Sequence, residues 1–96
     1  MIKVNVYGKN YVLDFAYSMD ERAEMNSGRI TKAMLCEDLG NKKDQNYSKP
    51  DYIGVAMKHP KDRDVKENAR KAAIRKLVSR FDYETRSSVW AAYFAR

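Results

Sequence analysis

Over the first half of the chain, hydrophobic residues alternate with polar ones, which is the pattern of β-strands with one buried face. Val4 and Val6 alternate with polar neighbours, the run 8–10 (Gly-Lys-Asn) supplies turn residues, and the alternation resumes over 13–19. This arrangement predicts a β-hairpin over residues 3–19.

Two further strands are expected, over residues 29–36 and 51–59, because alternation recurs in both segments. Residues 38–50 between them are mostly polar and end in Pro50. Proline cannot donate a ladder hydrogen bond, so this segment does not continue a strand. We predict a long polar surface loop over 38–50 and an antiparallel sheet of about four strands, built from two hairpins.

After residue 60 the hydrophobic period changes from two to about 3.6, which predicts a helix from about Asp64 to Phe81. Asp82 is a candidate N-cap for a second helix that carries the aromatic residues of the C-terminus. The sequence therefore predicts a single α+β domain over 1–96. Its sheet occupies 1–59, and two basic C-terminal helices within 60–96 pack on that sheet.

The formal net charge of +6 is unevenly distributed. Residues 1–57 carry eight Lys or Arg and eight Asp or Glu, whereas residues 58–96 carry eleven and five. A basic half is the electrostatic footprint of a protein that binds a polyanion or an acidic protein surface. The alternative interpretation is a lysine-rich helix face that only maintains solubility.

The basic residues of the first predicted helix fall on the side opposite its apolar residues, at about 100° per residue. Such a face could follow a phosphate backbone, which would make binding strongly salt-dependent. Solvated helix faces have a similar pattern, so both interpretations stand. The candidate binding residues are Lys66, Lys71, Arg75, Lys76 and Arg80.

Two other segments are candidate interfaces. Aromatic residues occur at helical spacing in the terminal helix, where they either pack on the sheet or form an exposed patch for a partner. The polar loop contributes lysines and a tyrosine. The candidate residues are Trp90, Tyr93 and Phe94 in the helix, and Lys42, Lys43 and Tyr47 in the loop.

Arg70 lies on the apolar arc of the first predicted helix, where a hydrophobic residue is expected. A buried guanidinium is costly unless it is paired. Asp62 and Asp64 are the nearest acids that precede the helix and could fold back onto it. We expect a structural pair between Arg70 and one of these carboxylates, with contact to a ligand as the alternative.

The chemistry available for catalysis is sparse, because the chain has one histidine, His59, and one cysteine, Cys36. Neither a two-histidine metal site nor a cysteine zinc cluster can form, and no glycine-rich phosphate-binding motif is present. We interpret His59 as a strand-end residue that hydrogen-bonds the next turn, and the alternative is a lone general base. We expect no enzyme activity, no catalytic residue, no metal and no cofactor.

The lone Cys36 cannot form an intramolecular disulfide, which fits a reducing cytoplasm. No window of the sequence approaches the ~20 apolar residues that cross a bilayer. The N-terminal residues also lack the apolar stretch of a signal peptide. We therefore expect a cytoplasmic protein without a membrane partner.

The run His59-Pro60-Lys61-Asp62, followed by Arg70 and the basic, alanine-rich segment 71–78, resembles a group of small accessory proteins encoded by bacteriophages and prophages. The resemblance covers roughly residues 29–80, about half of the chain, and includes the strand that precedes His59. The chain departs from the group's pattern by having an aspartate, residue 64, in place of an aromatic residue and an alanine, residue 69, in place of glycine.

The resemblance implies a hairpin-plus-helix scaffold in which His59, Asp62 and Arg70 fix the junction between loop and helix. It also implies a non-enzymatic protein in the host bacterial cytoplasm that binds and inhibits a host protein or ribonucleoprotein complex, in the manner of an anti-CRISPR inhibitor. The alternative is a small DNA- or RNA-binding module that uses the basic helix 64–81. The oligomeric state, monomer or homodimer, stays open.

Overall fold

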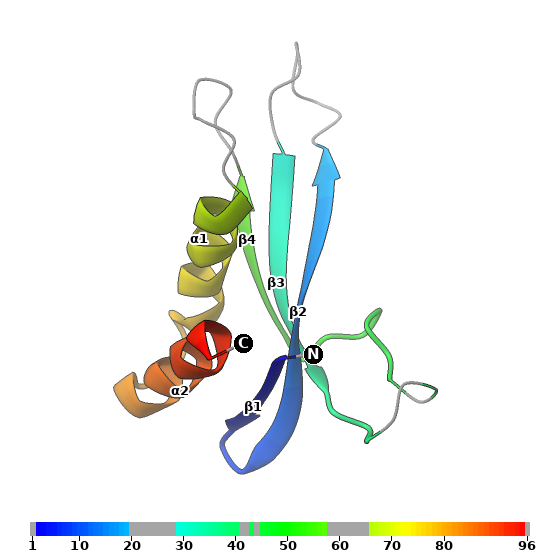
Figure 1. Ribbon diagram of the computed structural model, residues 1–96, viewed down its shortest axis with the longest axis vertical. Helices are drawn as coiled ribbons and strands as arrows, with labels where there is room; N and C mark the ends of the chain where they lie inside the picture. The colour runs from blue at the N-terminus through cyan, green and yellow to red at the C-terminus, as the bar shows by residue number, and fades with distance from the viewer. Residues whose placement is uncertain (1, 20–28, 41–42, 44, 58–65, 96) are drawn as a thin grey trace.

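The computed structural model describes residues 2–19, 29–40, 43, 45–57 and 66–95 of the 96-residue chain. Four antiparallel strands form one sheet in the order β1-β2-β3-β4, and two helices follow, which confirms the predicted α+β fold. Figure 1 shows both helices on one side of the sheet. The elements are β1 (Ile2–Val6), β2 (Lys9–Met19), β3 (Arg29–Glu37), β4 (Tyr52–Met57), α1 (Lys66–Val78) and α2 (Tyr83–Phe94).

The first hairpin turns one residue earlier than predicted, at Tyr7 and Gly8. Both residues have positive φ, 51° and 81°, which is the backbone of a two-residue hairpin turn that follows the twist of the strands. The side-chain oxygen of Asn5 accepts the Gly8 amide at 3.1 Å, and its amide group donates to Asn10 at 3.1 Å. Lys9 and Asn10 consequently belong to β2, where Lys9 pairs with Val6 of β1.

The hydrophobic core lies between the sheet and the two helices. Alternate residues of each strand point into it, as the period of two requires. Helix α1 packs on β3 and β4, and α2 packs mainly on β1. The fully buried side chains include Val6, Leu35, Ile74, Leu77 and Val89.

Helix α1 approaches β4 most closely at Gly54. A Cβ atom at this glycine would overlap the Ala73 carbonyl oxygen and the Leu77 amide nitrogen, and it would lie 2.7 Å from the Leu77 Cα. The missing side chain therefore allows the helix backbone to rest directly on the strand. On the sheet, Gly54 pairs with Ala33, which is also small and fully buried.

Helix α2 begins at the predicted N-cap. The carboxylate of Asp82 accepts the Thr85 amide at 3.0 Å. Hydrogen bonds from the Thr85 side chain and from this amide hold the pKa of Asp82 below its usual range. The buried row of α2 contains Val89 and Tyr93, which are spaced four residues apart on the face toward the sheet. Neither described helix is long and apolar enough to cross a membrane.

The opposite face of the sheet is partly covered. Val12, Met34 and Cys36 are buried there, and Figure 1 shows the connection between β3 and β4 on this side of the sheet. Gln45 holds the described part of the connection by donating to the Glu37 carbonyl at 2.7 Å and accepting the Leu39 amide at 3.2 Å. Farther along β4 the same face is open, with exposed side chains at Ile53, Val55 and Met57.

Candidate functional site

Three of the five basic residues predicted as one helix face contact three different parts of the fold. Lys71 lies with its ammonium 5.7 Å from the Phe94 ring centroid, so its row faces α2. The helix ends at Val78 and not at the predicted Phe81, so Arg80 lies in the turn after α1, where it donates to the Ile53 carbonyl of the edge strand β4 at 2.7 Å. Lys66 lies over the Tyr17 ring of β2 at 5.7 Å. The expectation of a single continuous face is therefore corrected.

The row toward α2 meets an aromatic row of the second helix. Lys71 and Arg75 are one turn apart on α1, and Trp90 and Phe94 are one turn apart on α2. These four side chains line one shallow, open depression, which we call the α1–α2 depression. No acidic residue is among the four, so the depression combines two cations with two aromatic rings.

The two aromatic rings of the depression lie nearly parallel, with an interplanar angle of 18° and a centroid separation of 5.7 Å. Trp90 is half-buried, whereas the Phe94 side chain is 60% exposed although it is apolar. Arg75 is exposed and Lys71 is half-buried beside them. The depression therefore offers an aromatic surface next to two positive charges.

The predicted interface must be corrected at Tyr93, because the side chain of this residue is fully buried and belongs to the core. Its ring contacts Phe15 of β2 edge-on, with centroids 5.9 Å apart. The same ring contacts Trp90 and Phe94, at 6.2 and 5.4 Å. Tyr93 therefore supports Trp90 and Phe94 from the side of the sheet and does not face a partner.

Arg70 joins α1 to β2 instead of lining the depression. Its Nε donates to the Tyr17 hydroxyl at 2.5 Å, and its guanidinium lies 5.5 Å from the Phe15 ring centroid. The hydrogen bond to Tyr17 raises the pKa of Arg70, so the side chain stays cationic. The predicted acidic partners, Asp62 and Asp64, and the predicted junction residue His59 lie outside the described residues, and their pairing stays a prediction.

The loop candidates do not join the α1–α2 depression. Lys43 is exposed and Tyr47 is 40% exposed, but Figure 1 shows their connection on the other side of the sheet from the helices. Lys42 lies outside the described residues. A partner on the helices would therefore not reach these side chains without wrapping around the sheet.

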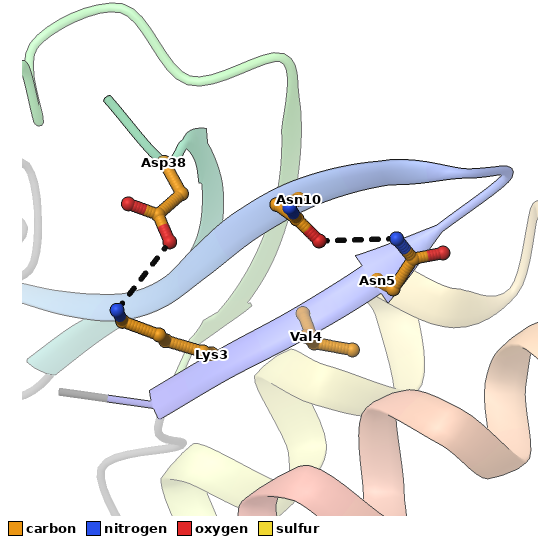
Figure 2. Close-up of a pocket in the computed structure, with 5 residues that line it drawn as sticks. All are labelled: Lys3, Val4, Asn5, Asn10 and Asp38. Carbon is orange, nitrogen blue, oxygen red and sulfur yellow. Dashed lines mark hydrogen bonds and ion pairs between the residues drawn. The ribbon is translucent and has the colours of Figure 1, made fainter. Parts of the chain in front are cut away.

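A second pocket lies beside the first hairpin (Figure 2). Its polar side chains bind one another, since Lys3 lies 3.8 Å from the Asp38 carboxylate and Asn5 donates to Asn10. The backbone amide of Asp38 also donates to the Asn10 carbonyl at 3.0 Å. These contacts fix the end of β3 against the first hairpin. The polar residues of this pocket therefore have a structural role, and no ligand is needed to account for them.

Within the described parts of the chain, no three His, Cys, Asp or Glu side chains gather as metal ligands. The buried thiol of Cys36 has a pKa raised mainly by burial, which disfavours the nucleophilic thiolate. No protein-family model, curated protein or solved structure matches this chain. The α1–α2 depression, with its two cations and two aromatic rings, is therefore the surface whose chemistry bears on function.

The sequence identified all four side chains of the depression but assigned them to two separate candidate surfaces. Each pair is spaced by four residues, so each helix showed its own row. The packing of α2 beside α1, which brings the rows together, depends on how both helices dock on different strands. No local pattern carries that information.

Proposed function

We propose that this protein is a non-catalytic nucleic-acid-binding protein whose contact surface is the α1–α2 depression. The observation that carries the proposal is the meeting of Lys71 and Arg75 with Trp90 and Phe94 in one open depression. The two cations bind phosphates, and the rings supply apolar surface for bases or sugars.

A face that served solubility alone would need the charges but not the exposed ring. Phe94 leaves 60% of its surface in water directly beside the cations, so a partner that covers this apolar area also meets the two positive charges. Arginine adds a planar guanidinium that binds phosphate with two donors and stacks on bases. The pairing of both features supports a nucleic acid over a purely acidic protein surface.

A salt titration of binding to a fluorescently labelled oligonucleotide tests this proposal. If Lys71 and Arg75 neutralise at least two phosphates, the logarithm of the association constant should fall against the logarithm of salt concentration. The slope should be at least as steep as about −1.4 for a single strand and about −1.8 for a duplex. Binding that is absent at low salt, or that does not change with salt, would contradict the proposal.

A second candidate function is stoichiometric inhibition of a host nucleic-acid-processing complex, as the resemblance to phage accessory proteins implies. The observation that favours it is the open face of β4, where Ile53, Val55 and Met57 remain 40%, 37% and 55% exposed. Apolar side chains on a sheet face are typical of contact with a protein. The cationic helices would then compete with nucleic acid on the bound complex.

Affinity purification from a bacterial host distinguishes this candidate from direct nucleic-acid binding. An inhibitor should retain one defined complex after nuclease treatment, and Val55→Asp should release it while Lys71→Glu has the smaller effect. A direct nucleic-acid binder should retain only nuclease-sensitive material. Retention of the same complex by the Val55→Asp variant would remove the support that the β4 face gives.

A further inference from the structure

The aromatic pair of the depression is placed to meet unpaired bases. We infer that the nucleic acid bound at the α1–α2 depression is single-stranded, with a base stacked against Trp90 and Phe94 and its phosphates beside Lys71 and Arg75. The inference rests on the proposed function and adds which form of nucleic acid is recognised.

Base stacking requires an aromatic ring whose π-face is open to the ligand. Phe94 is 60% exposed, with one face toward Trp90 and the mobile Lys71 ammonium over its ring at 5.7 Å, so a base can stack on it once that side chain moves aside. In a duplex, each base is already stacked on both sides, so a ring on a shallow surface reaches only backbone and groove edges. A duplex would use the two cations but leave the rings unused.

The aromatic pair, Trp90 and Phe94, is held in place before any ligand binds. Tyr93 is fully buried and contacts both Trp90 and Phe94, and it packs in turn against Phe15 of β2. Rings that are fixed by the core lose little conformational freedom when a base stacks on them, which favours affinity. The aromatic surface is therefore part of the folded scaffold.

Both cations of the depression lie within one side-chain length of the aromatic pair. The ammonium of Lys71 lies over the Phe94 ring, 5.7 Å from its centroid, so a stacking base must displace it, and the flexible side chain can then bind the phosphate of that nucleotide. Arg75 lines the same depression one helical turn farther along α1. One stacked nucleotide and its neighbour would therefore satisfy both cations.

Trp90 is the only tryptophan of the chain, so its fluorescence reports directly on the depression. The experiment titrates the protein with an oligothymidylate and, separately, with a duplex of the same length, and it follows both tryptophan emission and anisotropy of the labelled nucleic acid. The single strand should bind more tightly than the duplex and should quench Trp90. The duplex should leave the emission nearly unchanged.

The variant Phe94→Ala should weaken single-strand binding by roughly 5- to 150-fold, the usual effect of removing one stacking ring, and should change duplex binding little. Tyr83→Ala is the matched control, because Tyr83 is an aromatic residue of the same helix, is 75% exposed and does not line the depression. The control should bind like the unaltered protein. If Phe94→Ala folds poorly, Phe94→Leu retains the apolar contact while removing the ring.

Three results would overturn the inference. Equal affinity for single strand and duplex, together with an unchanged Phe94→Ala variant and a weakened Lys71→Gln/Arg75→Gln variant, would reject stacking and keep the proposed function. A preference for duplex would do the same. Failure to bind either form at low salt would reject the proposed function as well.

Discussion

The substitution Gly54→Ala tests how α1 is joined to the sheet. The added methyl group would lie 2.7 Å from the Leu77 Cα, whereas nonbonded carbon atoms prefer about 3.5–4.0 Å, so the helix must retreat by roughly 1 Å. Overpacking of this kind costs ~1–3 kcal/mol. We expect the upper end of that range, because the atoms in the way belong to the helix backbone and cannot change rotamer.

Alanine also gains roughly 0.5–1 kcal/mol over glycine in a strand, because it has less backbone freedom to lose. The net loss of unfolding free energy is therefore about 2 kcal/mol, a large fraction of the ~5–15 kcal/mol typical of a small domain. Urea unfolding with an unchanged m-value measures it, and Val55→Ala, on the opposite face of β4, is the control.

The double variant Gly54→Ala/Leu77→Ala adds a sharper test. Truncating the Leu77 side chain leaves its backbone atoms in place, so it should not rescue Gly54→Ala. Gly54→Ala with undiminished stability, or clear rescue by Leu77→Ala, would refute the close backbone contact.

Three further predictions concern stability and reactivity. Hydrogen bonds from Thr85 lower the pKa of Asp82, so the stabilisation from the ionised cap should be present above the ordinary carboxyl range and lost as pH falls through the lowered pKa. The variant Asp82→Asn should keep the cap but remove this pH dependence. Identical acid unfolding curves for the two proteins would contradict this prediction. Cys36 should react with a thiol reagent only as fast as the protein unfolds, since it is fully buried and its pKa is raised; rapid labelling of the native protein would oppose this account. Tyr17→Phe should lower the unfolding free energy by no more than about 1 kcal/mol, because the hydrogen bond to Arg70 is partly exposed; a much larger loss in urea unfolding would show that this contact matters more than its exposure indicates.

The sequence predicted the elements that short-range patterns encode. Alternation predicted the strands and the period of 3.6 predicted the helices, because each pattern reflects which side of an element is buried. The sequence also predicts Asp82 as the N-cap, because the capping hydrogen bond reaches only three residues along the chain. The turn residues Gly8, Lys9 and Asn10 predict the first turn one residue too late, because a tyrosine such as Tyr7 rarely adopts positive φ.

Features that depend on contact between distant segments were not predictable from these patterns. Gly54 reads as a weak strand residue in sequence, and its role appears only when α1 rests on it. The helical period could not show that Tyr93 is buried while Phe94, the next residue, is 60% exposed. That difference arises because α2 packs on β1 and leaves one side of its aromatic row uncovered.

The most direct test of the central claim compares two charge reversals. Lys71→Glu/Arg75→Glu alters the α1–α2 depression, whereas Lys49→Glu/Lys76→Glu alters two exposed lysines outside it, and both reduce the formal net charge from +6 to +2. Exposed charges contribute only ~0–1 kcal/mol to folding, so both variants should melt near the unaltered protein. At about 0.1 M salt, oligonucleotide binding by the first variant should fall at least about tenfold, because two phosphate contacts become repulsive, and the second should fall far less. Equal weakening by both variants would show that net charge alone governs binding and would contradict a site at the depression.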